Sequence, residues 1–560
     1  MHKSIQVVDL FAGPGGLGEG FNSVRDEQGE RVFKTLVSVE KEVSAHKTLT
    51  LRAFYRLLLD SGKGMAPYFD YLNGGEHPQN REDVRHFWLD AEQEALRLEL
   101  GGEDGNGTLE NILKKELDQT QDWVLIGGPP CQAYSVVGRV RNLGVKDYRP
   151  EEDKRHFLYR EYLDVIARHR PGVFVMENVR GMLTSKVGKK RIFGQILEDL
   201  HDPTNATGHE GPSNIASGQG GYTIFSLEDS SVYFPKTAGL FDSKVTLEEG
   251  EYSSFVVKTE DHGIPQARHR VILVGVRNDI VARRGGAPST AKFLEMEKTT
   301  VKSACGHGAQ VSAKRVLDPL PELRSGLSRH DGDEAWYSTV MRVARKVADQ
   351  LLEVPSEHVD YDTRRKISNM LQDISENPML GLSRKYTHKP ELNIVAPAGI
   401  DEWYHGAQDA NTKGFWYNHE ARSHMEEDLA RYLYCAVFAK VVGYSPIGEK
   451  EIYLDYLAPM HVNWKSGKFA DRFKVVVEDK PSKTITSHIS KDGHYYIHYD
   501  PLQCRSLTVR EAARLQTFPD DYFFEGNKTQ QYVQVGNAVP PLLARKIAQK
   551  VSNILKNVSG

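Results

Sequence analysis

The sequence predicts an α/β protein whose core is a parallel sheet, accompanied by a second, smaller domain. Short apolar runs typical of buried strands, such as 5–10, 122–126 and 173–176, alternate with helical patterns along the chain. Turns rich in glycine and proline follow the first two of these runs, where open α/β sheets place their binding sites. A length of 560 residues also exceeds what one compact core organises, which favours at least two domains.

The composition is that of a soluble globular protein, with 39% hydrophobic and 26% charged residues. No run approaches the ~18 apolar residues of a membrane span, and no apolar stretch typical of a signal peptide follows Met1. The four cysteines are widely spaced and predict free thiols, with neither a disulfide framework nor a metal site. We therefore expect a cytoplasmic protein without membrane contact. The net charge of −4 neither requires nor excludes nucleic acid, because phosphate contacts depend on local basic surface.

The first strand, 5–10, leads directly into a glycine-rich turn at 11–16 and a helix near 17–24. Glycines let backbone N–H groups approach a ligand closely, and a helix start adds partial positive charge. Glu40 ends a second strand, 33–39, where a ribose-binding acid stands in dinucleotide sites. By itself this pattern fits a nicotinamide dinucleotide and S-adenosylmethionine (AdoMet) equally well.

Residues 50–120 are interpreted as an insertion on the sheet. The pattern predicts a helix over 81–100, ended by the glycine-rich segment 101–107, and a second helix over 109–117. The sequence leaves three interpretations of this insertion open: a lid, a DNA-facing appendage, or a segment without a functional role.

Cys131 follows the predicted strand 122–126 after Gly127-Gly-Pro-Pro130, which cannot continue a strand. The thiol is therefore expected on a stiff loop at a strand's carboxyl end, where it is either a nucleophile or a small buried hydrophobe. The following segment, 135–149, is interpreted either as a loop that closes over a substrate or as an ordinary solvated loop.

Charged side chains flank two further predicted strands. Glu177 follows the apolar run 173–176, so its carboxylate is expected either to be paired or to be desolvated. After a long irregular connection over 202–254, Arg268 and Arg270 open another strand and share one face of it. The sequence leaves open whether these two guanidiniums bind an anion, hold a carboxylate or form ion pairs on the surface.

Taken together, six segments resemble the ordered motif set of the cytosine-C5 DNA methyltransferases of restriction–modification type. They occur in the family's order and span nearly the whole chain. The segments are Phe11-Ala-Gly-Pro-Gly-Gly16, Gly128-Pro-Pro-Cys-Gln132, Glu177-Asn-Val179, Gln266-x-Arg268-x-Arg270, Arg505-x-Leu-Thr-x-Arg-Glu-Ala-Ala-Arg-Leu-Gln-Thr-Phe-Pro519 and Gln534-Val-Gly-Asn-Ala-Val-Pro540.

The resemblance implies a catalytic role for four residues. C5 of cytosine is a poor nucleophile, so a thiolate at Cys131 would first add to C6 and make C5 reactive toward the methyl group. Glu177 would hold N3 and the amino group of the base, and Arg270 its O2, while Arg268 would steady a nearby carboxylate or phosphate. Because C6 is inaccessible in a stacked duplex, the base would be flipped out, with Gln132 and Ser135 contacting the DNA.

The resemblance also implies that AdoMet is the cofactor. The predicted cofactor-binding residues come from the glycine turn, the second strand, the segment around the cysteine and the C-terminal motif: Phe11, Ala12, Gly13, Gly15, Gly16, Glu40, Pro130, Leu158, Asn537 and Val539. Many relatives also carry an acidic residue after a third strand, and no equivalent is evident within the insertion.

These motifs predict a Rossmann-like AdoMet-dependent methyltransferase sheet with a target-recognition domain. The expected divisions are an AdoMet-binding catalytic domain over 1–277, a target-recognition region over 278–472, a small β-rich domain over 473–525 and a C-terminal segment, 526–560, that completes the catalytic domain. Within the third part, Thr508 is expected to cap the helix 509–518, with Glu511 at capping-box distance.

The sequence therefore predicts a site-specific DNA (cytosine-5-)-methyltransferase. We expect a bacterial, cytoplasmic monomer that acts on double-stranded DNA and protects it from a cognate restriction endonuclease without forming a stable complex with that enzyme. A cytosine-C5 methyltransferase acting on tRNA is the alternative within the fold. A dinucleotide-binding oxidoreductase is more remote, because it leaves Cys131, Glu177 and the C-terminal motifs unexplained, and an inactive DNA-binding regulator leaves the intact Pro-Pro-Cys unexplained.

Overall fold

The structure is a computed structural model of the 560-residue chain. It describes residues 4–130, 158–187, 190–209, 221–233, 252–298, 301–302, 308–377, 380–386, 400–405, 416–460, 464 and 471–556.

The chain forms two compact units, and the first is assembled from both ends of the sequence. The first unit comprises residues 1–263, 268–300 and 538–560, and the second comprises residues 264–267 and 301–537. The divisions at 277, 472 and 525 expected from the sequence are placed differently here, because 278–300 packs with the first unit, while 473–537 packs with 301–472. No described helix is both long and apolar enough to span a membrane.

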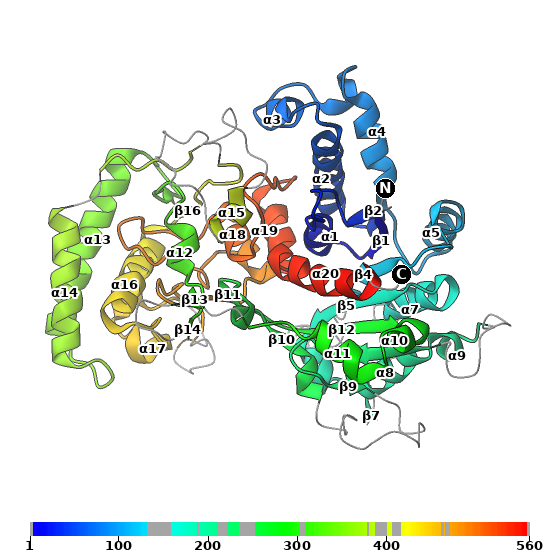
Figure 1. The fold of residues 1–560 in the computed structure, drawn as a ribbon. Coiled ribbons are helices and arrows are strands. Elements are labelled where there is room, and N and C mark those ends of the chain that lie inside the picture. The colour runs from blue at the N-terminus through cyan, green and yellow to red at the C-terminus, as the bar shows by residue number, and fades with distance from the viewer. Residues whose placement is uncertain are drawn as a thin grey trace. The chain divides into compact units, whose positions relative to one another are not determined.

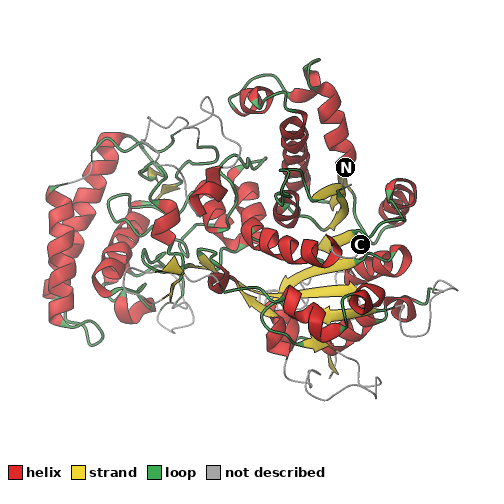
Figure 2. Ribbon diagram, viewed as in Figure 1, coloured by secondary structure: helices red, strands yellow, loops and turns green. Residues whose placement is uncertain are grey.

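A nine-stranded sheet forms the core of the first unit, in the order β3-β2-β1-β4-β5-β12-β8-β9, with β10 paired to β12 (Figures 1 and 2). β1 (Ile5–Leu10) pairs in parallel with β2 (Phe33–Glu40) on one side and with β4 (Val124–Gly127) on the other. β5 (Val173–Val179) continues the parallel part, whereas β12 (His269–Arg277) runs antiparallel to it. The expected α/β fold with a Rossmann-like sheet is confirmed.

The other elements of the first unit belong to this sheet or lie around it, and β6 and β7 form a separate two-stranded sheet. The remaining strands are β3 (Ala95–Arg97), β6 (Lys186–Val187), β7 (Lys190–Arg191), β8 (Tyr222–Phe225), β9 (Val232–Tyr233) and β10 (Val256–Lys258). The helices are α1 (Gly16–Asn22), α2 (Val43–Ser61), α3 (Ala66–Leu72), η1 (Pro78–Asn80), α4 (Arg85–Glu94), α5 (Glu103–Glu116), α7 (Leu158–His169), η4 (Arg180–Thr184), α8 (Phe193–His201), α9 (Pro203–Thr207), η5 (Tyr252–Phe255), η6 (Thr259–His262), α10 (Asn278–Arg283), α11 (Ala287–Leu294) and α20 (Pro541–Lys556).

The C-terminal helix α20 packs directly on α1, the helix that follows the glycine turn. A Cβ on Gly20 would stand only 2.3 Å from the Cβ of Ala544, so the two helices approach to a distance that only glycine permits. The last helix of the chain thus packs with the first strand–helix unit, on α1 and α11, whereas residues 526–537 of the predicted C-terminal segment belong to the second unit.

The insertion differs from its prediction at two points. The helix expected over 81–100 ends at Glu94, because Ala95–Arg97 pairs in parallel with β2 as an edge strand of the sheet. The segment 101–107, expected to break helical structure, instead begins α5 at Glu103. Gly105 allows this, because a Cβ there would stand 2.2 Å from the Glu99 carbonyl oxygen. Tertiary pairing and close packing therefore override local propensity here.

The connection expected to be irregular over 202–254 contributes two strands to the sheet. β8 pairs antiparallel with β12, and β9 pairs with β8 at the sheet edge. The Gly-, Ser- and Asn-rich surroundings hide the run Tyr222-Thr-Ile-Phe225, all of whose side chains are buried. Pairing with β12, rather than local composition, decides the structure of this run.

The second unit is largely helical (Figure 2). Its strands are short: β11 (Gln266–Ala267), β13 (Val301–Lys302), β14 (Gly308–Ala309), β15 (Gly326–Leu327), β16 (Ser423–His424) and β17 (Ser482–Lys483). Its helices are α12 (Ala313–Leu317), α13 (Asp333–Glu353), α14 (Tyr361–Glu376), α15 (Ile400–His405), α16 (Glu426–Val442), α17 (Gly448–Glu451), η7 (Asp455–Leu457), η8 (Ser487–Ser490), α18 (Val509–Leu515) and α19 (Lys528–Asn537).

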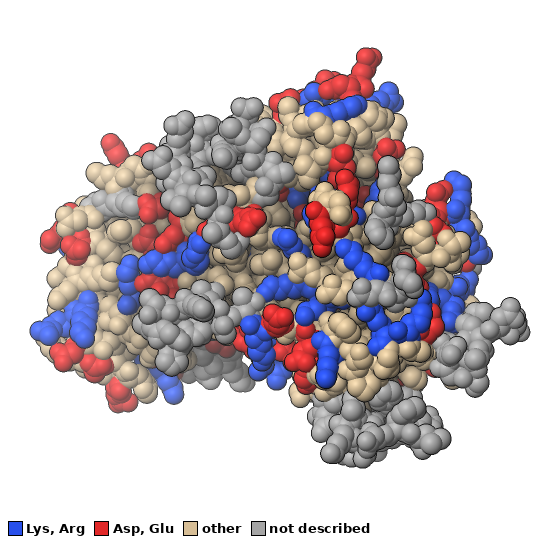
Figure 3. All heavy atoms as spheres, in the orientation of Figure 1, with Lys and Arg blue, Asp and Glu red and all other residues tan. Residues whose placement is uncertain are grey.

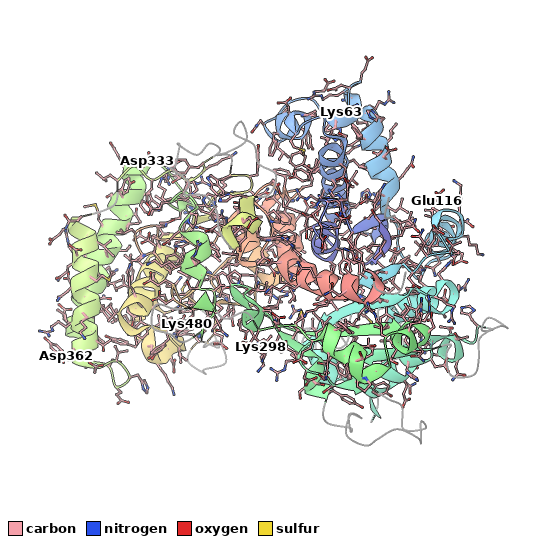
Figure 4. All side chains as sticks on the ribbon, viewed as in Figure 1. Lys63, Glu116, Lys298, Asp333, Asp362 and Lys480 are labelled. Atoms are coloured by element: carbon pink, nitrogen blue, oxygen red, sulfur yellow. The ribbon has the colours of Figure 1, made fainter. Side chains whose placement is uncertain are left out.

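Helices α13 and α14 form an antiparallel pair that packs against α16. Asp333 and Asp362, near the starts of α13 and α14, lie at opposite ends of this pair (Figure 4). The buried residues of α13 recur at helical spacing, as expected for a helix with one core-facing side.

Residues 473–525 do not form the small β-rich domain expected from the sequence. Their backbone pairing consists of the two-residue strand β17 and isolated bridges such as Val475 with Ile497. The apolar residues of this segment are nevertheless buried within the second unit, so its strand-like composition reflects burial rather than a ladder. The capping box predicted for Thr508 and Glu511 is confirmed at the start of α18.

Candidate active site

The candidate active site lies at the carboxyl ends of β1 and β4, where the strand order of the sheet reverses. β2 and β3 continue the sheet on one side of β1, and β4 and β5 continue it on the other. In open α/β sheets this reversal opens a crevice beyond the strand ends, in which ligands bind. The glycine turn follows β1 and Gly127–Pro130 follows β4, so both predicted site segments start at this reversal of strand order.

The glycine turn adopts a conformation that ordinary residues rarely reach. Phe11, Gly13 and Gly15 have φ values of 57°, 57° and 92°, in the left-handed region. This backbone conformation is energetically unfavourable for a residue other than glycine, so the φ of Phe11 indicates local strain. Strained residues of this kind cluster at functional sites. A Cβ on Gly16 would stand 2.2 Å from the Val539 carbonyl oxygen, which brings the predicted residue Val539 against the turn.

The Glu40 carboxylate lies beside the glycine turn at the end of β2. Its Oε2 accepts a hydrogen bond from the Gly13 amide at 2.9 Å, and Oε1 accepts from the amides of Lys41 and Glu42 at 2.9 and 2.8 Å. The Ala12 amide donates a hydrogen bond to the Val39 carbonyl oxygen at 3.0 Å. The turn and the acid predicted from the sequence are therefore in direct contact.

β3 supplies an acid that the sequence prediction missed. Glu99 follows this strand closely, and its carboxylate pairs with the Lys41 ammonium, next to Glu40, at 3.3 Å. Leu158, predicted to flank the cofactor, also lies at this edge, with a side-chain carbon 3.3 Å from a Cβ position on Gly101. The short run Ala95-Leu-Arg-Leu98 could have indicated a strand. The helix predicted over 81–100 instead included it.

The segment that leads to Cys131 is held against β5. Asn178 donates from Nδ2 to the Pro129 carbonyl oxygen at 3.1 Å, and its Oδ1 accepts from the Val179 amide at 2.9 Å. A Cβ on Gly128 would stand 3.2 Å from Glu177 Oε2, so this carboxylate faces the same segment. Pro130 is half-buried and is the last described residue before the cysteine.

Glu177 and Arg270 form an ion pair across β5 and β12. Arg270 Nε lies 2.9 Å from Glu177 Oε1, and the two side chains are 13% and 12% exposed. This Nε has no aligned hydrogen bond among the described residues, while Nη1 donates to the His269 carbonyl at 2.9 Å. The sequence left open whether the Glu177 carboxylate is paired or desolvated, and the structure shows that it is paired, with both side chains slightly exposed.

Arg268 lies two residues earlier and is fully buried, with 1% of its surface exposed. Its amide donates to Thr259 Oγ1 at 3.1 Å, and its carbonyl accepts from the Thr259 amide at 3.3 Å. A buried guanidinium suits the positioning of protein groups better than contact with a solvated phosphate.

Four predicted site residues are not among the described residues of the first unit. Cys131, Gln132 and Ser135 lie outside the described residues, and Asn537 ends α19 in the second unit. The neighbouring motif residue Gln266 also belongs to the second unit, where its amide donates to the Leu515 carbonyl at 3.1 Å and accepts from the Ile485 amide at 2.7 Å. The described residues contain no cluster of side chains suited to a metal ion, so the expectation of no metal site stays a prediction.

Comparison with known proteins shows what this arrangement is similar to. The family described as C-5 cytosine-specific DNA methylase matches residues 99–203 and 243–553, and thus not the glycine turn. A type II methyltransferase, M.Bpa9945I of Bacillus paralicheniformis, is 30% identical over 98% of this chain and 99% of its own length. The type II methyltransferase M.AgeI of Thalassovita gelatinovora is 24% identical over 98% and 99%. The DNA (cytosine-5-)-methyltransferase M.ApeKI of Aeropyrum pernix is 25% identical over 78% and 82%.

Proposed function

Since this chain belongs to the C-5 cytosine-specific DNA methylase family, we propose that it methylates cytosine through a transient bond from Cys131 to the base. The protein is a DNA (cytosine-5-)-methyltransferase of the type II restriction–modification kind. The covalent mechanism, the cofactor and the protective role form our proposal. The Glu177–Arg270 pair, beside the backbone that leads to Cys131, is the observation that carries it.

The proposed reaction begins with addition of the Cys131 thiolate to C6 of a cytosine that has left the helix. The new S–C6 bond shifts the electron pair of the C5=C6 bond to C5, which takes the methyl group. A base then removes the C5 proton, and the S–C6 bond breaks to restore the C5=C6 bond and release the thiolate. Flipping the base costs a few kcal/mol, which contacts in the site must offset.

Glu177 and Arg270 would bind the edge of the flipped base. The Glu177 carboxylate accepts from the exocyclic amine, and a proton shared with N3 draws electrons away from C6. Arg270, whose Nε faces Glu177 and whose Nη1 donates to the His269 carbonyl, would hold O2. Arg268, buried behind this segment, would steady the strand start rather than contact DNA.

The residues around the glycine turn fit AdoMet. When bound, AdoMet supplies a methyl group on a positively charged sulfur. Gly13, Gly15 and Gly16 leave the backbone open to a ligand, and Glu40 lies where its carboxylate can accept from two ribose hydroxyls. Phe11, Ala12, Pro130, Leu158 and Val539 would line the same site, and Asn537 remains a cofactor-binding residue that the family resemblance implies. We add Glu99 as the acid on the adenine side.

The DNA substrate calls for local basic surface despite the net charge of −4. Figure 3 shows Lys and Arg side chains on the face of the first unit that α20 crosses. α20 carries Arg545, Lys546 and Lys550, and α10 ends with Arg283. We propose that the enzyme acts as a cytoplasmic monomer and protects bacterial DNA from a cognate nuclease without binding that nuclease stably.

Trapping the covalent intermediate tests the mechanism. Duplex DNA containing 5-fluorocytosine cannot lose a C5 proton, so with AdoMet it should remain attached to the protein through Cys131. Cys131→Ala should abolish both the adduct and methyl transfer while AdoMet binding is retained. Methyl transfer at wild-type rates by Cys131→Ala would remove the cysteine from its role.

Two further assays separate the remaining alternatives. Transfer of a tritiated methyl group should occur into DNA and not into tRNA, and transfer into tRNA alone would favour the other substrate. Bisulfite sequencing of a plasmid from expressing cells should reveal one recurring sequence context around the modified cytosines. Resistance of that plasmid to a nuclease of the same specificity would support the protective role.

A further inference from the structure

Asp9 is a buried carboxyl group that the proposed mechanism does not use. It stands near the carboxyl end of β1, two residues before the glycine turn begins, and is 1% exposed. Neither carboxylate oxygen has a hydrogen-bond partner among the described residues. The closest approach comes from α1, because a Cβ on Gly18 would stand 3.0 Å from Oδ2. An ionised carboxylate so placed is costly unless other charges offset it.

The positive charge that acts on Asp9 comes from Arg56 of the insertion, within a group of ion pairs. Arg52 of α2 donates two hydrogen bonds to Glu19 of α1, from Nε to Oε2 at 2.9 Å and from Nη2 to Oε1 at 2.6 Å. Arg56, one turn further along α2, lies 3.8 Å from Glu19 Oε2 and pairs closely with Glu94 of α4. We call Asp9 and these four residues the turn cluster.

The turn cluster holds an odd number of charges. Three carboxyl groups, of Asp9, Glu19 and Glu94, face two guanidiniums, of Arg52 and Arg56. With all groups ionised the cluster carries one net negative charge, and with Asp9 protonated it is neutral. Although burial acts against ionisation, Arg52 and Arg56 hold the pKa of Glu19 below its usual value, so Asp9 is the group left to carry the proton.

We propose that Asp9 holds a proton in the ligand-free protein and releases it to solvent when the cationic methyl donor binds, which favours the donor over its uncharged product. This inference rests on the proposed function, because AdoMet carries a sulfonium charge and S-adenosylhomocysteine carries none. A positive charge at the glycine turn balances the carboxylate that the released proton leaves behind. Once the methyl group has been transferred, the product has no positive charge on sulfur to balance the Asp9 carboxylate.

The groups around Asp9 agree with this assignment. Burial raises the pKa of Asp9 to about 8, against the smaller opposing effects of the Gly18 amide and Arg56, and the charges of Glu40 on β2 and Glu94 on α4 raise it further. Tyr162 on α7 faces it, and burial keeps this phenol neutral by raising its pKa. β4, on the other side of β1, brings only apolar side chains and Gly127.

Calorimetry in two buffers of different ionisation enthalpy measures the proton released on binding. Near pH 7.5 the wild-type protein should release more protons with AdoMet than with S-adenosylhomocysteine, by a large fraction of one proton per site. Asp9→Asn should lose this excess, and Asp90→Asn, an exposed change on α4, should keep it. The amino group of the ligand titrates in the same way with every variant, so the difference belongs to Asp9.

The affinities should follow the same linkage. For each unit by which the bound donor lowers the pKa of Asp9, the preference for AdoMet over S-adenosylhomocysteine should rise about tenfold between pH 6 and 9. This rise should disappear in Asp9→Asn. Equal pH profiles in the wild type and Asp9→Asn would overturn the inference.

Infrared difference spectroscopy tests the wild-type protein directly and does not depend on the folding of a variant. Addition of AdoMet should remove the band of a protonated carboxyl group, and addition of S-adenosylhomocysteine should not. AdoMet binding without this loss would refute the role of Asp9 and leave the proposed function intact. Failure of both ligands to bind would instead refute the proposed cofactor.

Discussion

The turn cluster of the first unit and a second buried cluster, around α18 in the second unit, balance their charges differently. The α18 cluster consists of Arg505, Arg510, Glu511, Arg514 and Asp520, each at most 1% exposed. Arg505 makes two 2.6 Å hydrogen bonds to Glu511, and Arg514 makes bonds of 2.8 and 2.5 Å to Asp520. Here each carboxylate has its own guanidinium partner.

The third guanidinium of the α18 cluster is satisfied by backbone. Arg510 donates to the carbonyl oxygens of Tyr417, Pro519 and Tyr522 at 2.9, 2.9 and 2.6 Å. The turn cluster instead keeps one carboxyl without a hydrogen-bond partner among the described residues. The comparison teaches that a cluster whose charged side chains are all hydrogen-bonded fixes a scaffold, whereas a cluster with one carboxyl group left without such a bond keeps a group that can still titrate.

The largest expected effect is the loss of one partner in the α18 cluster. Glu511→Gln leaves the Arg505 guanidinium buried without its counter-charge and weakens the capping box of α18. Such a loss should destabilise the second unit by ~3–5 kcal/mol. Denaturant titration followed by hydrogen exchange of second-unit peptides measures it. Glu426→Gln, which breaks an exposed pair with Arg342, is the matched control and should cost no more than ~1 kcal/mol.

Acid should weaken the second unit next. Burial lowers the pKa of His419 to about 4 and that of His424 to about 3, below the value of 6.5 expected in the unfolded chain. The unfolded state therefore binds more protons below pH 6.5, and stability falls as the pH drops toward 4. We expect a loss of ~2–4 kcal/mol by pH 5. Hydrogen exchange of second-unit peptides that is unchanged between pH 7 and 5 would contradict this.

The first unit should show a dependence of opposite sign through Asp9. Because burial raises the pKa of Asp9 to about 8, its contribution to stability is complete below about pH 4 and is lost as the pH rises toward 8. Asp9→Asn cannot ionise, so the difference in unfolding free energy between pH 5 and 8 should change by ~3–4 kcal/mol in favour of the high-pH state. Denaturant titrations of both proteins at the two pH values test this, and parallel profiles would refute it.

The smallest effect on stability is expected at Glu99. Its pair with Lys41 is exposed, so Glu99→Gln should change the unfolding free energy by no more than ~0.5 kcal/mol. If Glu99 contacts the adenine, the same variant should bind AdoMet several-fold more weakly, as measured by calorimetry. Glu116→Gln, which removes an exposed pair with Lys115 elsewhere in the first unit, should change neither quantity. Equal AdoMet affinities for both variants would remove Glu99 from the site.

Local patterns predicted much of the first unit. Ile5–Leu10, the glycine turn and Glu40 were predictable because each is specified by adjacent residues, namely an apolar run, a set of glycines and a strand end. The capping box of Thr508 and Glu511 was predictable for the same reason, since its two residues are three positions apart. Cys131 was singled out by its local context, and its role stays a proposal.

Long-range pairing was not predictable from local pattern. Ala95–Arg97 becomes a strand because β2 offers it an edge, and Tyr222–Phe225 becomes one because β12 does. The contact of Gly16 with Val539 joins residues more than five hundred positions apart. The composition of 473–525 predicted strands that the structure does not contain. The apolar residues of this segment are buried without forming a β-ladder.

The sequence alone determined the order of the motifs and the α/β class, and it singled out the side chains that we propose to react, since these depend on residue type and short spacing. Only the tertiary structure decided that Arg270 pairs with Glu177 and that Glu99 follows an edge strand beside Glu40. It also decided that the insertion places two guanidiniums against three carboxyl groups beneath the glycine turn. The physical reason is that burial and charge balance are sums over residues far apart in the chain, which no local pattern contains.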